Sequence, residues 1–378
     1  MRLNVFLEAK PLYYDKIDHK RVHIAYALLK PQIHRPQTIH IVGTNGKGST
    51  GRMVAYLAHK SGLNVGHYSS PHILKFNERF WLDGFDASDG LLEEAHQRLY
   101  AILGASVSDG LSYFEYTTLL AFVLFENCDL MVLEAGLGGE FDATNVCDKE
   151  LSIITPIGLD HQDFLGDTIA EIATTKIKSI QKKVLLAPQI YDEVYAIAQK
   201  IIDAKGARRY DIRTKDLLEE MLKKEGWVSY LIENATVAIH AVHILGLLCD
   251  YTELKTLELF GRFYPLTANI RIDVGHNPLA SQAIANALED KVILIYNSLD
   301  DKDYHEVLRI LKPKIKHVEI IAIDTQRAST IAEIEKALED LEIAYSNFEG
   351  KIENDENYLV FGSFYVVEAF LKRYNNGK

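Results

Sequence analysis

The segment from His40 to Thr50 constrains this chain more than any other stretch. Its sequence, HIVGTNGKGST, is an apolar strand running into a glycine-rich loop with one lysine, and a helical pattern follows. Glycines let successive backbone N–H groups turn toward a phosphate, Lys47 supplies a positive charge, and a helix N-terminus adds its dipole. The segment therefore predicts a nucleotide phosphate site. It is a variant of the GxxxxGK[ST] loop, because Gly48 separates Lys47 from Ser49.

Composition narrows the class of protein. The 378 residues carry a formal net charge of −12, with 48% hydrophobic and 25% charged residues, which is typical of a globular protein with two or three domains. The acidic balance and the lack of a long Lys/Arg run argue against a nucleic-acid partner. With no long apolar run and a short, polar start, we expect a cytoplasmic enzyme without a membrane partner. The three cysteines lack metal-type spacing.

Short apolar runs alternate with amphipathic segments of helix length, which predicts parallel α/β sheets. We expect a first sheet with strands at 38–42, 64–68, 129–134, 151–155 and 183–187 and helices at 49–61, 91–103, 115–127 and 168–180. A second block has expected strands at 269–274, 292–296, 317–322 and 358–361. Because a helical stretch at 234–248 precedes this block, we place the division between domains 1–257 and 258–378.

Polar residues follow several of the predicted strands, where ligands bind in open α/β sheets. Glu134 ends an apolar strand and precedes a glycine-rich loop, so we favour a Mg²⁺ ligand over an acid facing solvent. Ser70 and His161 follow two other strands. A hydroxyl suits Mg²⁺, whereas a histidine is unusual there, and His161 taken alone is more often a hydrogen-bonded loop residue.

Other residues have two interpretations from the sequence alone. Lys176 reads as a solvated lysine on a helix, and Asp142 as a turn or cap residue. In the second block, Arg262 can clamp a phosphate and Asp273, at a strand end, can bind ribose or adenine. Asn277-Pro278 is also an ordinary helix start.

Several motifs together resemble the folylpolyglutamate synthase/dihydrofolate synthase family, which belongs with the Mur ligases. The resemblance spans nearly the whole chain and rests on His40–Thr50, YSSPHILKFNER at 68–79, SYFEYT at 112–117, LEAGLGGEFDATN at 133–145, GLDHQDFLGDT at 158–168, 273–278 and 361–365. It implies a P-loop NTPase-like parallel-sheet domain of the Mur ligase central-domain type, followed by a smaller Rossmann-like domain. It also implies an active site between the two domains.

The resemblance also implies roles for single residues. ATP would be bound by Gly46, Lys47, Gly48, Ser49, Asn234, Arg262 and Asp273. Two Mg²⁺ ions would be held by Ser70, Glu134, His161 and Lys176, the last as a carbamylated lysine. Lys47, Lys176 and His161 would be the catalytic residues. Pteroate or glutamate would be contacted by Lys16, Ile17, Asp18, Phe114, Glu115, Tyr116, Phe141, Asp142, Ala143, His276 and Ser363.

The implied reaction joins L-glutamate to dihydropteroate and to reduced folates through an acyl phosphate, at the expense of ATP, and we expect a monomer. A monofunctional enzyme, a Mur-type amino-acid ligase and an ATP-dependent regulatory protein are the alternatives. The chain departs from the family pattern at Glu140, where an arginine is usual, and at 174–178, where TTKIK replaces the usual residues around the modified lysine.

Overall fold

The computed structural model describes residues 1–10, 18, 20–212 and 216–376, and its contacts divide the chain into two compact units. Unit 1 comprises residues 1–157, 167–219 and 233–257. Unit 2 comprises 158–166, 220–232 and 258–378. Each unit is built around its own sheet.

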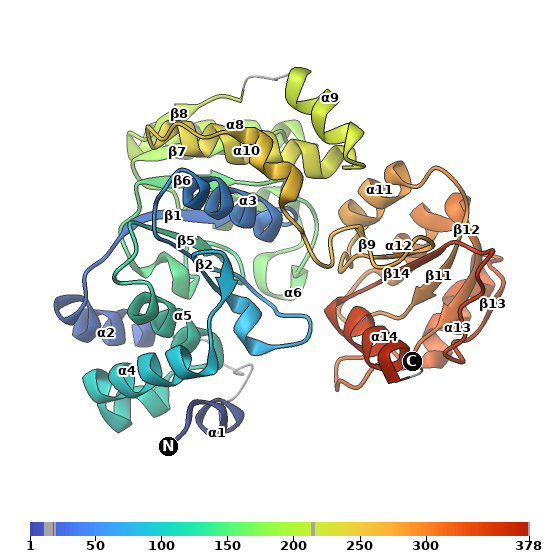
Figure 1. The fold of residues 1–378 in the computed structure, drawn as a ribbon, viewed down its shortest axis with the longest axis horizontal. Coiled ribbons are helices and arrows are strands. Elements are labelled where there is room, and N and C mark those ends of the chain that lie inside the picture. Colours follow the sequence, from blue (N-terminus) through green and yellow to red (C-terminus); the bar gives the residue numbers. More distant parts are fainter. Residues whose placement is uncertain (11–17, 19, 213–215, 377–378) are drawn as a thin grey trace. The chain divides into compact units, whose positions relative to one another are not determined.

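The sheet of unit 1 has eight strands in the order β4-β3-β2-β5-β1-β6-β7-β8, and Figure 1 labels the run from β2 to β8. The last six of these pair in parallel, whereas β3 and β4 continue the edge next to β2 in antiparallel fashion. The strands are β1 Gln37–Val42, β2 Val65–Tyr68, β3 Phe80–Leu82, β4 Phe85–Asp86, β5 Leu130–Glu134, β6 Leu151–Ile154, β7 Lys183–Leu186 and β8 Arg208–Tyr210.

Helices cover both faces of this sheet. Every residue of β5 is buried, as expected for a parallel strand with helices on both faces. Tyr68, Met131 and Leu133 pack in one core with apolar residues of α1, α2, α4 and α5. On the opposite face, a side chain added at Gly51 of α3 would lie 3.2 Å from Ile41 of β1.

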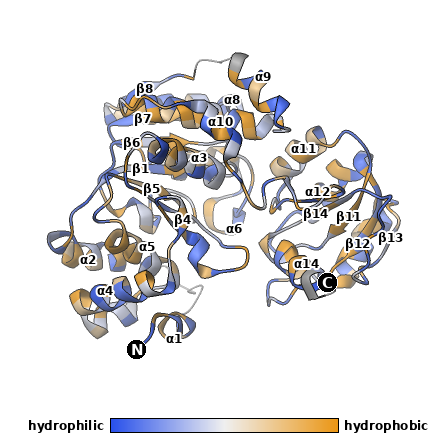
Figure 2. Cartoon of the chain, in the orientation of Figure 1, coloured by the Kyte–Doolittle hydropathy of each residue, from blue (hydrophilic) through white to orange (hydrophobic). Residues whose placement is uncertain are grey.

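The helices and 3₁₀ turns that begin in unit 1 are α1 Leu3–Glu8, α2 Lys20–Leu29, η1 Lys30–Gln32, α3 Lys47–Lys60, η2 Phe76–Arg79, α4 Asp89–Gly110, α5 Tyr113–Leu124, η3 Ala143–Val146, α7 Ile169–Ile177, α8 Asp192–Lys205, α9 Asp216–Lys224 and η4 Tyr251–Thr256. Along α2 and α4, hydrophobic and hydrophilic residues alternate, as in helices that bury one face (Figure 2). Among the described residues, no helix combines the length and apolarity needed to span a membrane.

The sheet of unit 2 has the order β13-β12-β11-β14-β10-β9, parallel except for the pairing of β9 with β10. Its strands are β9 Tyr264–Pro265, β10 Ile270–Ile272, β11 Val292–Tyr296, β12 Ile315–Ile320, β13 Tyr345–Asn347 and β14 Tyr358–Phe361. Its helices are α6 Gln162–Leu165, α11 Pro278–Ala287, α12 Tyr304–Leu311, η5 Lys312–Lys314, α13 Ile331–Asp340 and α14 Phe364–Asn376. Helix α10, Ser229–Ile244, begins in unit 2 and continues into unit 1.

The predicted α/β class with parallel sheets is confirmed, and the predicted strands of both blocks are present. The sequence reading missed the antiparallel edge β3–β4 and strands β8, β9 and β13, each only two or three residues long. The predicted helix end at 103 agrees with a break in α4 at Gly104, whose φ of 72° suits glycine. The prediction did not include the second helical piece, which runs on to Gly110. The division into domains 1–257 and 258–378 stays a prediction. By its contacts, unit 2 contains segments 158–166 and 220–232 in addition to residues 258–378.

Candidate active site

The phosphate loop predicted from the sequence, residues 43–48, begins where β1 ends and leads into α3. Gly46, with φ of 82°, is the N-cap residue of the helix, and as a glycine it has no side chain to cap the helix start. The backbone N–H groups of Thr44 and Asn45 donate to the carbonyl of Pro156 at 2.9 and 3.2 Å. A side chain at Gly46 would lie 2.8 Å from the amide oxygen of Asn234, so only glycine fits there. The loop thus places Asn234 directly against the predicted phosphate site.

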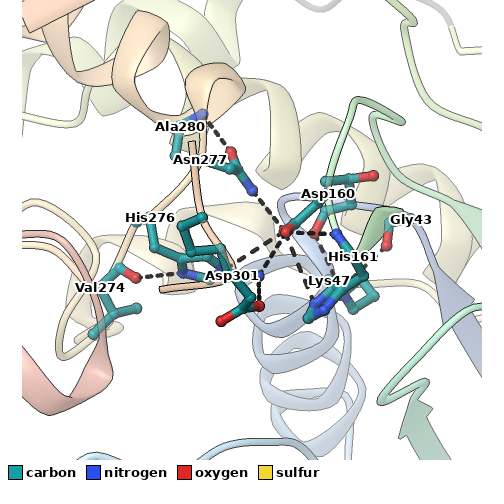
Figure 3. A network of polar contacts seen from close by, with 12 residues as sticks. Gly43, Lys47, Asp160, His161, Val274, His276, Asn277, Ala280 and Asp301 are labelled. Atoms are coloured by element: carbon teal, nitrogen blue, oxygen red, sulfur yellow. Dashed lines mark hydrogen bonds and ion pairs between the residues drawn. The ribbon is translucent and has the colours of Figure 1, made fainter. Parts of the chain in front are cut away.

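Two lysines converge on one backbone carbonyl of this loop. Lys47 Nζ donates to Gly43 O at 3.1 Å, and Lys176 Nζ donates to the same oxygen at 2.9 Å (Figure 3 labels Lys47 and Gly43). Lys176 is only 4% exposed, so the interpretation of a solvated helix lysine is wrong. Because the two residues are far apart in sequence, this convergence is a product of the fold and puts a second cation at the phosphate loop.

Ser70 and Glu134 also meet at this edge of the sheet. They follow Tyr68 and Leu133, which are paired neighbours in β2 and β5. Glu134 Oε2 accepts a hydrogen bond from the Ser70 backbone N–H at 3.3 Å, and the Glu134 carboxylate is buried. The alternative of an acid facing solvent is therefore wrong. The structure brings these two predicted metal ligands together at the carboxyl ends of adjacent strands.

A second loop, residues 136–141 with the sequence GLGGEF, follows Glu134 and is called the glycine-rich loop below. It packs against the end of α7 that carries Lys176. A side chain at Gly139 would lie 2.5 Å from the backbone oxygen of Lys176, so the two backbones are in close contact. The Glu140 N–H donates to Thr175 O at 2.9 Å. The position of Lys176 is thus set by this glycine-rich loop.

Asp142 holds the same loop from inside. One carboxylate oxygen accepts from the Leu137 N–H at 2.8 Å and the other from the N–H and hydroxyl of Thr144. Burial raises the pKa of Asp142, while these hydrogen bonds oppose the shift. The Thr144 hydroxyl in turn contacts Nε2 of buried His40 at 2.7 Å. Asp142 therefore fits its interpretation as a turn and cap residue, and a direct contact with pteroate stays a prediction.

The three residues of the Phe-Glu-Tyr segment have different surroundings. Phe114 lies beside the glycine-rich loop, 2.6 Å from where a Gly136 side chain would be. Glu115 caps α5 through the Ser112 backbone at 2.7 Å and pairs with Arg21 at 3.6 Å. Tyr116 is fully buried, and its hydroxyl contacts His96 at 2.7 Å. Of the three, Phe114 is the residue placed at the carboxyl ends of the strands.

Of the remaining predicted pteroate contacts, Asp18, Phe141 and Ala143 are described by the structure and belong to unit 1. Lys16 and Ile17 fall outside the described residues. Asp18 is exposed and accepts from the Lys20 N–H at 2.9 Å. Phe141 is 56% exposed, whereas its neighbour Ala143 is buried. An exposed aromatic ring in the glycine-rich loop suits contact with a flat aromatic ligand.

In unit 2, Asp273 follows β10 and is tightly held. Its carboxylate accepts from the Tyr230 hydroxyl and the Phe263 N–H at 2.8 Å each and from the Gly275 N–H at 2.7 Å. Burial raises its pKa, and the charge of Arg262 acts in the opposite direction. The Arg262 guanidinium lies 5.4 Å from the centre of the Phe364 ring. Arg262 and Asp273 are thus close enough to interact electrostatically at one strand end.

Asp160 is the centre of a second cluster in unit 2 (Figure 3). Lys302 Nζ donates to Asp160 Oδ1 at 2.7 Å, Asn277 Nδ2 donates to Oδ2 at 3.0 Å, and His276 Nε2 lies 3.5 Å from Oδ2. Burial alone would raise the pKa of Asp160, but the hydrogen bond from His276 and the neighbouring positive charges bring it well below its usual range. The cluster fixes the segment that bears His161, a residue in the left-handed region with φ of 55°.

The cluster includes a functional candidate that the sequence reading missed. Lys302 is buried and also pairs with Asp301 at 3.1 Å. In the sequence, a lysine within the run DDKD looks like a solvated turn residue. Its contact with distant Asp160 is what identifies Lys302 as a candidate. Ser363, a predicted glutamate contact, is buried at the start of α14, and its hydroxyl accepts from the Val366 N–H at 3.2 Å.

Comparison with known proteins places this geometry in a family. No protein-family model matches the chain. The dihydrofolate synthase/folylpolyglutamate synthase of Haemophilus influenzae is 30% identical to it over 398 aligned residues, which cover 89% of this chain and 88% of that protein. The chain belongs to the dihydrofolate synthase/folylpolyglutamate synthase family. The resemblance seen in the sequence is thus confirmed, and the protein is an ATP-dependent ligase.

Solved structures of this family agree with the assignment. The Helicobacter pylori folylpolyglutamate synthetase is 40% identical, with a TM-score of 0.81 over 99% of this chain and 98% of that one. A bifunctional folylpolyglutamate synthase/dihydrofolate synthase with Mn, AMPPNP and L-glutamate bound is 25% identical, with a TM-score of 0.83 over 98% of this chain and 97% of that one. A nucleotide and a divalent metal are therefore ligands within the family.

The residues of unit 1 fit such a metal. Among the described residues, no three His, Cys, Asp or Glu side chains gather into a metal site. Mg²⁺ needs no such cage when a nucleotide is present, because it is usually held by one or two carboxylates, water and phosphate oxygens. Buried Glu134 beside Ser70 matches this donor set. His161 belongs to unit 2, and its role as a metal ligand stays a prediction.

The two departures from the family pattern meet in the structure. Glu140, which replaces the usual arginine, forms an ion pair with Lys178 at 3.2 Å, and Lys178 lies in the unusual stretch around Lys176. The two departures thus place an acid opposite a lysine, between the glycine-rich loop and the end of α7.

Proposed function

We propose that this protein joins L-glutamate to 7,8-dihydropteroate, giving dihydrofolate, and to reduced folates, extending their glutamate chains. The observation that carries the proposal is the convergence of Lys47 and Lys176 on Gly43 O, in the same sheet edge as the Ser70–Glu134 pair. This arrangement offers the cation of Lys47, a second lysine that carbamylation would turn into a metal ligand, and a buried carboxylate at a phosphate loop, which is the set needed to activate a carboxylate with ATP and metal ions.

The nucleotide would be held by residues of both units. Gly46, Gly48 and Ser49 would present backbone and hydroxyl donors to the phosphates with the charge of Lys47, and Asn234 would contact the nucleotide from beside Gly46. Arg262 and Asp273 would contribute a cation and an acceptor for ribose or base. The observed hydrogen bonds to Asp273 leave this acidic group oriented before a ligand arrives.

Ser70 and Glu134 would bind one Mg²⁺, with His161 as the third protein ligand. Lys176 in carbamylated form would bind a second Mg²⁺, because the modification turns a donor ammonium into an anionic oxygen ligand. The metal ions would neutralise charge on the triphosphate and on the attacking carboxylate. Holding two ammonium groups at one carbonyl is unfavourable, so the modification would also remove the repulsion between Lys47 and Lys176.

The reaction proceeds by two displacements. A carboxylate oxygen of the acceptor attacks the γ-phosphorus of ATP, the bond to the β-phosphate oxygen breaks, and an acyl phosphate and ADP form. The amine of L-glutamate then attacks the acyl carbon, phosphate leaves, and the amine proton is lost to solvent or phosphate. Lys47 offsets the negative charge that otherwise keeps the carboxylate from the triphosphate. The protein needs no side-chain nucleophile.

The acceptor would be contacted by Phe114 and Phe141, the two rings beside the glycine-rich loop. Lys16, Ile17, Asp18, Glu115, Tyr116, Asp142 and Ala143 would complete the region. His276 and Ser363, on neighbouring loops of unit 2, would bind L-glutamate. We further propose that the enzyme acts in the cytoplasm as a monomer.

The experiment that tests this function offers the purified protein ATP, Mg²⁺ and L-glutamate with either dihydropteroate or tetrahydrofolate, and identifies the products by mass. We expect both acceptors to gain one glutamyl residue. Product from one acceptor alone would show a monofunctional enzyme. No product from either acceptor would contradict the proposal and favour a Mur-type acceptor or ATP binding without ligation.

A further inference from the structure

The loop between β2 and β3 holds a buried guanidinium. Arg79 is only 9% exposed, its Nε donates to His72 Nδ1 at 2.8 Å, and its guanidinium carbon lies 5.3 Å from the centre of the Tyr113 ring. Within the part of the chain that the structure describes, the Arg79 side chain forms no ion pair. A buried cation of this kind favours an anionic ligand, because desolvation without a counterion is costly.

The acid next to Arg79 in the chain does not neutralise it. The Glu78 carboxylate instead accepts from the backbone N–H groups of Ile73, Leu74 and Lys75 at 2.7, 2.8 and 2.7 Å. These three hydrogen bonds close the loop around its own carboxylate. The loop is therefore built so that the acid shapes the backbone and the guanidinium retains its charge.

A cavity of about 820 Å³ lies in unit 1 next to the side chains that hold this guanidinium. His72 and Tyr113, the two side chains that contact Arg79, both line it, and Phe76, Leu7 and Leu92 give it an apolar part. Cavities of this size and polarity suit a small ligand with an aromatic body and a few charged groups.

Two acids of the cavity are already engaged by the protein. Glu93 Oε2 accepts from the Leu3 N–H at 2.9 Å, and Asp89 Oδ1 accepts from Asn77 Nδ2 at 2.8 Å. These two carboxylates thus hold α1 and the loop between β2 and β3 in place.

The lining of the cavity also includes Glu8, Arg2 and Lys10, and the Lys10 ammonium donates to the backbone carbonyls of Ser108 and Leu111. His72 is the lining residue that donates no charge of its own but contacts the Arg79 guanidinium, so this wall is where an anion would meet a cation that no acid among the described residues pairs with.

The acceptors of the proposed reaction differ in their number of carboxylates. Dihydropteroate has one, which reacts, whereas a folate ends in a glutamyl group whose γ-carboxylate reacts and whose α-carboxylate does not. Ser70, proposed at the reacting centre, and His72 are two residues apart in one loop. A second carboxylate of the same glutamyl group would therefore lie near the reacting one and near this wall.

We propose that Arg79, positioned by His72 and Tyr113, binds the α-carboxylate of the glutamyl group of folate acceptors. This inference rests on the proposed function and extends it to acceptor specificity. Since His72 Nδ1 accepts from Arg79, a neutral His72 carries its proton on Nε2 and offers a second donor. The planar guanidinium suits a carboxylate, which can bind it through two parallel hydrogen bonds.

The test compares tetrahydrofolate with its α-carboxamide, which keeps the reacting γ-carboxylate, on the wild-type protein and on Arg79→Met. We expect the substitution to raise KM for tetrahydrofolate by roughly 10- to 100-fold, the range for a lost hydrogen bond to a charged group. KM for the α-carboxamide and for L-glutamate should stay within about twofold of the wild-type values. Lys75→Met, which removes an exposed charge from the same loop, is the matched control and should leave the preference for the acid unchanged.

An equal rise in KM for acid and amide, or a rise in KM for L-glutamate instead, would overturn the inference. If Arg79→Met does not fold, Arg79→Lys keeps the charge but not the fork, and its preference for the acid should be smaller than in the wild type. An unchanged preference in Arg79→Lys would count against the inference. Wild-type protein that ligates only dihydropteroate would refute it while leaving the ligase function standing, and no ligation at all would refute that function instead.

Discussion

The close contact between Gly139 and Lys176 gives a prediction whose size follows from the structure. In Gly139→Ala the new methyl group would stand 2.5 Å from the Lys176 backbone oxygen and 2.9 Å from its Cα, whereas ordinary contacts begin at 3.4 Å. The end of α7 must therefore move by about 0.9 Å. Overpacking of this kind costs roughly 1–3 kcal/mol of unfolding free energy. A displacement of about 1 Å at a catalytic group costs on the order of 10²-fold in rate.

We expect kcat for ligation at saturating substrates to fall on the order of 10²-fold, with the protein still folded. The assay pairs steady-state ligation with urea unfolding. Gly110→Ala is the matched control, because a side chain at this last residue of α4 meets nothing within 4 Å and should leave both quantities nearly unchanged. A stability loss of the expected size with wild-type kcat would refute the role given to Lys176.

Three further predictions concern the charged groups. Glu134→Gln should lower the rate of metal-dependent ligation by at least about 100-fold. It should lower the free energy of unfolding by less than about 1.5 kcal/mol. A near-normal ligation rate would show that Glu134 is not a metal ligand. Lys176→Ala should lose activity that short carboxylic acids partly restore, and intact mass of the wild type should show the carbamate; an unmodified, fully active lysine would contradict it. Asp160→Asn removes one of the two carboxylates that pair with buried Lys302, Asp301 being the other, and should cost roughly 1.5–3 kcal/mol in urea unfolding at pH 7, the range for a lost hydrogen bond between charged groups. Because the folded pKa of Asp160 is depressed, its contribution is complete above about pH 4 and is lost as pH falls through the folded pKa. The difference between wild type and Asp160→Asn should therefore shrink in acid, and a pH-independent difference would contradict the assignment.

The sequence predicted the features that local rules determine. The phosphate loop follows from glycine positions in one short segment, and the strands follow from apolar runs between turn residues. Glu134 and Ser70 could be placed together because the carboxyl ends of parallel strands share one edge, and the structure joins them at 3.3 Å. Periodicity gave no signal for β3 and β4, which are too short to show one.

Local sequence rules could not predict the contacts between segments that are far apart in the chain. Lys176 and Gly43 are 133 residues apart, and Asp160 and Lys302 are 142 apart, so nothing local distinguishes either lysine from a solvated one. Tyr116 and Phe114 belong to one motif, yet one side chain faces the core and the other the glycine-rich loop. Which face a helix buries depends on its tertiary partners, and a short motif does not contain that information.

The central claim is that the acceptor carboxylate is activated by phosphoryl transfer from ATP. The most direct test uses an acceptor with ¹⁸O at both oxygens of its reacting carboxylate and analyses the phosphate released in ligation by mass spectrometry. Because an acyl phosphate leaves one carboxylate oxygen on the departing phosphate, the account predicts one ¹⁸O in each phosphate per ligation. Unlabelled phosphate alongside ligated product would contradict it.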